Sequence, residues 1–246
     1  VAMTDLHAAW GLVGWTVLLV AGVAYQVVPM FQITPPYPQR LSRGFVPLMA
    51  ALLAVWSVLA LNDWETAARL AGLALAVGVA LFALTTLYLL TRRRRKIGDP
   101  TLGYWRTGMA SLLAGALLWL SALLIPALAQ TPQVEMLLGI LLIFGFAVAV
   151  INGMLYKIVP FLAWFHLQAQ LLRRAKVPNM KQLLPEVRIR RQWWAYLAAL
   201  LLLLAAAVAP AVFTYPAALA LGVAGIGLGV NLSSVWRIYR QVIANP

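Results

Sequence analysis

Apolar residues occur along this chain in runs of about twenty or more, separated by short polar segments. A bilayer core of about 30 Å requires roughly 20 helical residues to cross it, so each run is long enough for a transmembrane helix. The alternation with period two that membrane strands require is not sustained in any run. The pattern predicts helices near residues 8–30, 44–62, 66–91, 103–129, 135–166, 192–212 and 215–237. The predicted fold is an all-α integral membrane protein, a bundle of about seven transmembrane helices forming a single domain over residues 1–246.

Charged residues separate between alternate loops. Cations follow the first, third, fifth and seventh predicted helices: Arg40 and Arg43; Arg92 to Arg95 and Lys96; Arg173, Arg174, Lys176, Lys181, Arg188, Arg190 and Arg191; Arg237 and Arg240. The other loops hold the acids Asp5, Asp63, Glu65 and Glu135, with Arg69 as the only cation near them. Because cytoplasmic loops collect Lys and Arg, this pattern predicts an outside N-terminus and a cytoplasmic C-terminus in an inner membrane.

Composition agrees with lipid as the solvent, since 63% of the 246 residues are hydrophobic and 10% are charged. The net charge of +13 would suggest nucleic acid in a soluble protein, but the basic loops account for it here, so the expected partner is the bilayer. The absence of cysteine excludes disulfides, thiolate metal sites and covalent haem attachment. Because Val1 stands directly before an apolar run, we also expect a processed chain or part of a longer one, with helices upstream.

Two segments 131 residues apart share a pattern that predicts an internal repeat over residues 7–30 and 138–161. Gly14-Trp15 aligns with Gly145-Phe146, Gly22 with Gly153, and the segment Tyr25–Pro29 with Tyr156–Pro160. Both predicted helices run from outside to inside, so the repeat is parallel rather than inverted.

The first of these helices carries a row of small residues below a histidine. His7, Gly11, Gly14, Leu18, Gly22, Tyr25 and Pro29 follow one another at steps of three or four, which predicts one common face on a uniform helix. A glycine face admits another helix, which is the more frequent use in membranes, or a planar macrocycle. His7 lies about 27 Å along the axis from Tyr25, near the outer surface, whereas His166 lies near the inner end of the fifth helix. These two histidines therefore cannot bind the same metal ion.

Lys157 stands near the cytoplasmic end of the fifth predicted helix, where we expect its ammonium to reach the headgroups. Asn152 and Asn231 are expected to join helices through their amides.

The segment from Leu6-His7 through Gly22 and Tyr25 to Pro29-Met30 resembles the second helix of haem–copper oxidase subunit I. It is still more similar to the NnrS-like bacterial membrane proteins, distant relatives that contain haem and copper. The resemblance implies a bacterial inner-membrane protein that binds haem b through His7, with Gly11, Gly14, Gly22 and Tyr25 beside the macrocycle. Met136 is a lesser candidate for a second iron ligand. The second haem histidine and the copper-binding histidines of the oxidases have no match here, and Leu138 stands at the position equivalent to His7 in the second repeat.

The predicted function is that of a haem-b-binding membrane protein related to that superfamily, in redox or nitric-oxide-linked physiology. The sequence contains no Walker sequence, His-Glu-x-x-His motif or pair of intramembrane carboxylates, so it does not predict a hydrolase or a proton pump. Whether the chain is another kind of enzyme stays open. Two alternatives remain. One is a non-catalytic accessory or assembly subunit that binds other membrane redox subunits or a second copy of itself; the other is a small-molecule transporter.

Overall fold

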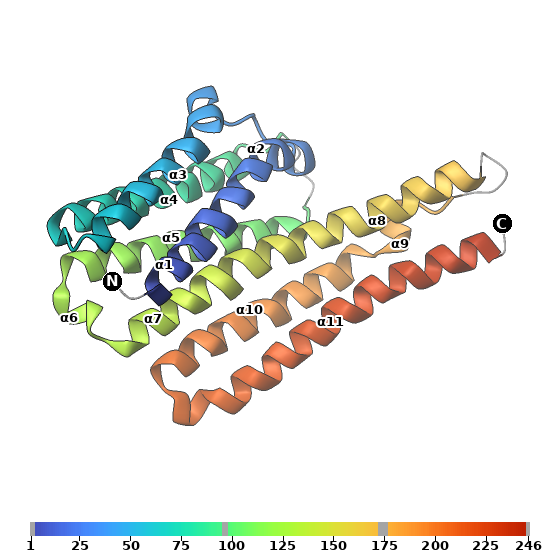
Figure 1. The fold of residues 1–246 in the computed structure, drawn as a ribbon. Coiled ribbons are helices and arrows are strands. Elements are labelled where there is room, and N and C mark those ends of the chain that lie inside the picture. Colours follow the sequence, from blue (N-terminus) through green and yellow to red (C-terminus); the bar gives the residue numbers. More distant parts are fainter. Residues whose placement is uncertain (1–2, 95–97, 172–176, 245–246) are drawn as a thin grey trace. The chain divides into compact units, whose positions relative to one another are not determined.

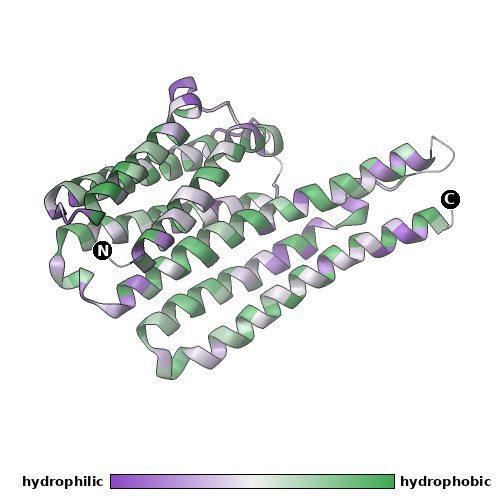
Figure 2. Ribbon diagram, viewed as in Figure 1, coloured by the Kyte–Doolittle hydropathy of each residue, from purple (hydrophilic) through white to green (hydrophobic). Residues whose placement is uncertain are grey.

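The structure is a computed structural model that describes residues 3–94, 98–171 and 177–244. These residues form helices and no strand, and seven of the helices are long and apolar enough to cross a membrane. Hydrophobic residues predominate along these helices, and hydrophilic residues occur mainly toward the helix ends (Figures 1 and 2). This confirms the prediction of an all-α, multi-pass membrane protein. The spans are Met3–Gln32, Gln39–Leu61, Glu65–Thr91, Thr101–Leu124, Pro132–Leu171, Glu186–Val208 and Pro210–Ala244.

Prolines set two helix boundaries that the hydropathy pattern placed too late. The predicted span over 103–129 ends at Leu124, because Ile125 adopts an extended conformation (φ −119°, ψ 99°) before Pro126. A separate short helix, α6 (Pro126–Ala129), follows. The predicted span over 192–212 ends at Val208, and Pro210 begins the next helix, where the missing N–H of proline costs nothing.

The first and fifth spans each contain a π-helical stretch, in which the backbone bonds skip one residue more than in an α-helix. The first span consists of α1 (Met3–Ala9), η1 (Trp10–Val17) and α2 (Leu18–Gln32). The fifth consists of α7 (Pro132–Gly139), η2 (Ile140–Val148) and α8 (Ala149–Leu171). Shifted by 131 residues, η1 would cover 141–148, which is almost the range of η2. The two π-helical stretches therefore occupy matching positions in the two segments of the predicted repeat, and the repeat itself stays a prediction.

The chain divides into two compact units, one from residues 1–97 and 106–148 and the other from 98–105 and 149–246. In the first unit, α3 (Gln39–Leu61) and α4 (Glu65–Thr91) pack side by side as a hairpin, and the first span packs on α3. In the second unit, α10 (Glu186–Val208) and α11 (Pro210–Ala244) form the corresponding hairpin, and α8 packs on α11. Helix α5 (Thr101–Leu124) contributes its first turn to the second unit and its remainder to the first.

The end of the first span is held by the loop that follows α4. Arg93 donates its Nε–H to the carbonyl oxygen of Gln32 at 2.8 Å, and the backbone N–H of Arg94 donates to the carbonyl of Ile33 at 2.9 Å. The Arg93 guanidinium thus satisfies a terminal carbonyl at the negative end of the α2 dipole.

Candidate functional site

The row of residues predicted on one face of the first span has different surroundings along its length. His7, in the last turn of α1, is exposed, and so are Gly11 and Gly22, where an added Cβ would meet nothing within 4 Å. Gly14 is half-buried, and a Cβ there would lie 3.0 Å from the side chain of Leu53. The prediction of a single uniform face is wrong, because η1 holds more residues in each turn than the α-helix assumed from the spacing.

In the second repeat the equivalent glycines are covered by a helix. Within the first unit, a Cβ on Gly145 would lie 2.6 Å from the Oγ of Ser111 in α5. Within the second unit, a Cβ on Gly153 would lie 2.9 Å from the Cβ of Tyr104, also in α5. The glycines of the second repeat therefore serve close helix packing, whereas Gly22, the equivalent of Gly153, is open.

The repeat-related tyrosines also have different partners. Tyr156 accepts a hydrogen bond from the amide Nδ2 of Asn231 at 3.0 Å. The hydroxyl of Tyr25 is buried, with no hydrogen-bond partner among the described residues, and its ring lies edge-on to Tyr37 at a centroid distance of 5.0 Å. The Tyr37 hydroxyl, 2.9 Å from Thr86 Oγ1, stays neutral because burial raises its pKa.

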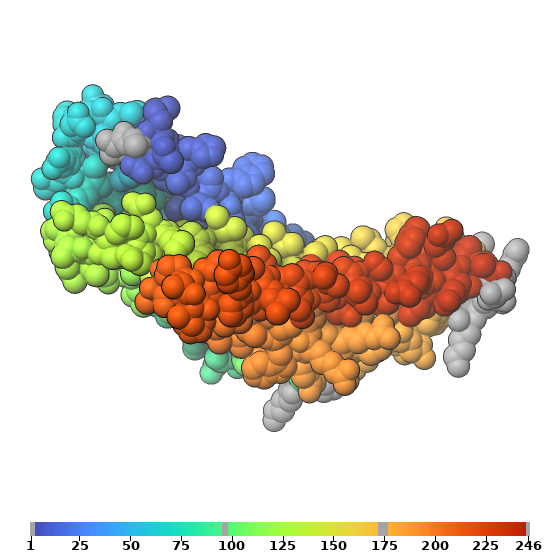
Figure 3. All heavy atoms as spheres, turned by 90° about the horizontal axis from the view of Figure 1, so that it is seen from below, coloured from blue at the N-terminus to red at the C-terminus, as the bar shows by residue number. Residues whose placement is uncertain are grey.

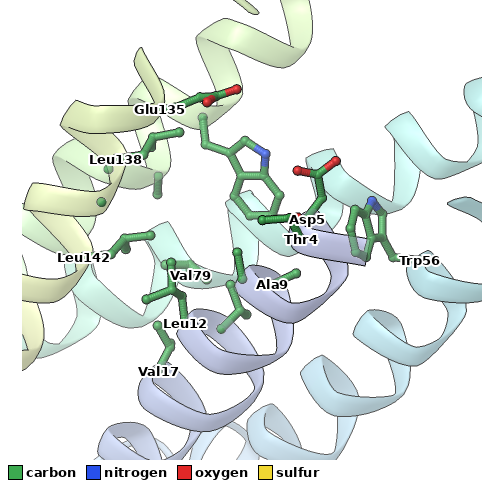
Figure 4. A pocket seen from close by; sticks show the side chains of 16 residues that line it. Thr4, Asp5, Ala9, Leu12, Val17, Trp56, Val79, Glu135, Leu138 and Leu142 are labelled. Atoms are coloured by element: carbon green, nitrogen blue, oxygen red, sulfur yellow. The ribbon is translucent and has the colours of Figure 1, made fainter. Parts of the chain in front are cut away.

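A cavity of about 470 Å³ lies in the first unit between the N-terminal parts of the first and fifth spans. Residues of α1 and η1, including Asp5 and Leu12, line it from one side, and Glu135 and Leu138 line it from the other (Figure 4). Trp56 of α3 and Trp119 and Gly115 of α5 complete the wall. Most of the lining is apolar, and its only ionisable side chains are the two carboxylates, which makes the cavity suited to a small organic molecule with an apolar body.

His7 itself does not line this cavity, although Leu138, its equivalent in the second repeat, does. The described residues contain no group of three or more His, Asp or Glu side chains that could hold a metal ion. Met136 is 47% exposed and also lies outside the cavity lining. The described residues therefore fit a haem in part: an exposed imidazole and an open position at Gly11 are present, but no histidine or methionine lines the cavity of the first unit.

Lys157 forms an ion pair with Asp99, and both residues belong to the second unit. The ammonium of Lys157 thus has a specific partner in the segment before α5, while its expected position near the headgroups stays a prediction. Asp99 also accepts hydrogen bonds from the backbone N–H and hydroxyl of Thr101, at 3.0 and 2.8 Å, at the start of α5. Burial alone would raise the pKa of the Asp99 carboxyl, but the bond and charge of Lys157 and the bonds from Thr101 lower it below its ordinary 3.8.

Sequence reasoning missed this pair and most of the cavity wall. Asp99 directly precedes Pro100-Thr101, and this sequence is typical of the start of a helix. The pattern indicates that the Asp99 side chain binds the backbone there, but it does not identify Lys157 as a second partner. Trp56 and Trp119 give no signal at all, because single tryptophans within apolar runs do not show which space they face.

The fold defines a multi-pass α-helical membrane protein. No protein-family model, curated protein or solved structure matches the chain, so the functional argument rests on its own residues.

Proposed function

We propose that the chain lies in a bacterial inner membrane with its N-terminus outside and its C-terminus in the cytoplasm. The sorting of charged loops supports this orientation. The hydrogen bonds of Arg93 and Arg94 to the end of the first span agree with the proposed topology, in which the first and third spans end on the same side of the membrane. Five of the cations that carry the prediction, Arg95, Lys96, Arg173, Arg174 and Lys176, lie outside the described residues.

Orientation can be tested with single cysteines, since the chain contains none of its own. Gln130→Cys, between α6 and α7, should react with a membrane-impermeant maleimide on intact cells. Gln39→Cys, at the start of α3, should react only after permeabilisation. The opposite labelling pattern would invert the proposed orientation.

We further propose that the protein binds haem b, with His7 as one axial ligand, in redox or nitric-oxide-linked physiology. The observation that carries this proposal is the exposed imidazole of His7, followed four residues later by the open backbone position at Gly11, in the segment that resembles the oxidase helix. A bound haem would supply a redox-active iron. The chain itself would supply the imidazole of His7 and the open backbone position at Gly11.

The two histidines of the chain provide a matched test. A reduced-minus-oxidised spectrum with pyridine haemochrome quantitation should show a b-type signal in the purified protein, and His7→Ala should abolish it. His166→Ala is the control, because His166 is exposed and its Nδ1 contacts the carbonyl oxygen of Leu162 at 2.8 Å. A colourless wild-type protein, or equal signals in all three proteins, would refute the assignment.

A second candidate is an accessory subunit of a respiratory membrane complex. The open face at Gly22 favours it, because the equivalent Gly153 seats a helix. A helix of another subunit, or of a second copy, would then cover Gly22. Gly22→Leu should abolish co-purification with redox subunits, whereas Gly222→Leu in α11, another open position, should not. Unchanged co-purification of the Gly22 variant would remove this candidate.

A third candidate is a small-molecule transporter, which the cavity between parallel repeats favours. Its carboxylates Asp5 and Glu135, together with the indoles of Trp56 and Trp119, suit an organic cation. Ethidium uptake into proteoliposomes should be lost when Gly139→Leu fills the cavity and retained in Gly222→Leu. Equal uptake by both variants would contradict transport through this cavity.

A further inference from the structure

A second cavity, of about 350 Å³, lies in the second unit between the first turns of α10 and the last third of α11. Its polar lining consists of Arg188 from α10 and Asn231, Ser234, Arg237 and Gln241 from α11. It therefore combines one guanidinium from each helix with neutral polar groups and contains no acidic side chain. We propose that this cavity binds the phosphate group of an anionic phospholipid.

The floor of the cavity is polar and fixed. Asn231 and Ser234 are each 8% exposed. The Asn231 amide donates to Tyr156 and to the carbonyl oxygen of Arg188, at 3.0 and 3.5 Å. The Ser234 hydroxyl donates to the carbonyl oxygen of Asn231 at 2.6 Å. The bond from Asn231 joins the backbone of Arg188 to α11, and none of these bonds uses the guanidinium of Arg188 or Arg237.

The charge of the two arginines is not balanced by an ion pair among the described residues. Glu186, the acid nearest in sequence to Arg188, is bound to Lys181 at 3.0 Å. Two guanidinium groups on one cavity repel each other, and an anion between them removes that repulsion. The planar guanidinium donates two parallel N–H bonds to phosphate oxygens, so this pair suits phosphate better than a simple halide.

A lipid phosphate fits the location better than a free one. Basic pockets between helices at the cytoplasmic boundary are a known form of headgroup site. Val230, which lines the cavity, is 54% exposed, and Ile226 one turn earlier on α11 is 70% exposed. This apolar surface continues along α11, which is uncovered on the face shown in Figure 3. It offers acyl chains a path directly below the phosphate.

A simpler explanation is that Arg188 and Arg237 are topology signals in the headgroup region, as any exposed cation there would be. Arg190 and Arg240 lie on the same two helices, are exposed and do not line the cavity. They provide a control of equal charge. If only bulk charge matters, removing either pair must have the same effect.

The test measures binding of phosphatidylglycerol, phosphatidylcholine and inorganic phosphate to the delipidated, purified full chain by native mass spectrometry. Arg188→Gln with Arg237→Gln should lower phosphatidylglycerol affinity by about tenfold or more, and Arg190→Gln with Arg240→Gln by less than about twofold. Arg-to-Lys changes at the cavity pair keep the charge and should give an intermediate loss. Circular dichroism shows whether each variant is folded.

Three outcomes would overturn the proposal. Equal losses in the two glutamine pairs would reduce the effect to bulk charge. Equal binding of phosphatidylglycerol and phosphatidylcholine would show that the cavity does not select the net negative charge of an anionic phospholipid. Competition by inorganic phosphate at the same concentration as the lipid would assign the cavity to a free anion. None of these results bears on His7, so the haem proposal stands or fails separately.

Discussion

The two glycines Gly22 and Gly153 allow a direct test of how the repeats differ. Both lie inside α-helices, so replacing either by alanine gains about 0.5–1 kcal/mol from the reduced backbone entropy of the unfolded chain. At Gly153 the new Cβ would lie 2.9 Å from the Cβ of Tyr104 and 3.6 Å from the carbonyl oxygen of Thr101. A Cβ cannot rotate away, so the helices must shift, at an overpacking cost of about 1–3 kcal/mol.

The expected net effect of Gly153→Ala is therefore destabilisation by up to about 2 kcal/mol. Gly22→Ala has no neighbour to displace and should stabilise by up to about 1 kcal/mol. Unfolding of the purified protein by SDS, followed by tryptophan fluorescence in one mild detergent, compares the two variants with the wild type. The same helical ellipticity before SDS is added shows that each variant starts folded.

Two results would refute this reasoning. If Gly153→Ala is as stable as Gly22→Ala, the first turn of α5 does not pack on α8 at the described distance. If Gly22→Ala is instead the destabilised variant, the face at Gly22 is covered in the purified protein. A second helix or a bound group would then be the object of the next experiment.

Further perturbations test the polar contacts. Asp99→Asn should destabilise the fold by about 2 kcal/mol, between the values for exposed and buried pairs, because it leaves the half-buried Lys157 without its charge partner. The Asp99 pKa is lowered in the folded protein, so the ion pair contributes its full stability above the ordinary pKa of 3.8. This contribution is lost as the pH falls through the lowered pKa. Thermal unfolding measured against pH should show this loss of stability in acid for the wild type and not for Asp99→Asn. Glu186→Gln breaks an exposed pair and should change the SDS midpoint by less than about 1 kcal/mol, and a larger change would contradict its surface position. Tyr156→Phe should cost about 0.5–1.5 kcal/mol in the same titration because it removes a buried bond, whereas Tyr25→Phe removes an unpaired hydroxyl and should be neutral or stabilising.

The seven spans could be predicted from the sequence because hydropathy over about twenty residues reflects a requirement of the bilayer itself. Helix ends were less certain, since Ile125 and Ala209 belong to the apolar runs around them and only the following prolines end the helices. The amide bridge predicted for Asn231 is confirmed by its bond to Tyr156.

The contents of the site could not be predicted in the same way. Steps of three and four residues are typical of an α-helix, and the sequence of Trp10–Val17 does not predict a π-helix. The π-helix changes which residues share a face with His7. The partner of Lys157 could not be predicted because Asp99 is 58 residues away in sequence. Long-range pairs depend on helix packing, which hydropathy does not specify.

Equivalent residues of the two predicted repeats differ in their contacts, and this difference indicates where a further group could bind. Gly153 and Tyr156 have their contacts from Tyr104 and Asn231, so the second repeat uses its motif for packing within its own unit. The first repeat has kept the glycine and the tyrosine without acquiring such partners: Gly22 is open and the Tyr25 hydroxyl is unpaired among the described residues. A buried hydroxyl without a partner costs free energy, so the contacts of the described residues do not account for the Tyr25 hydroxyl. We therefore expect a further helix or ligand to contact the first span at Gly22 and Tyr25, and this span also carries His7.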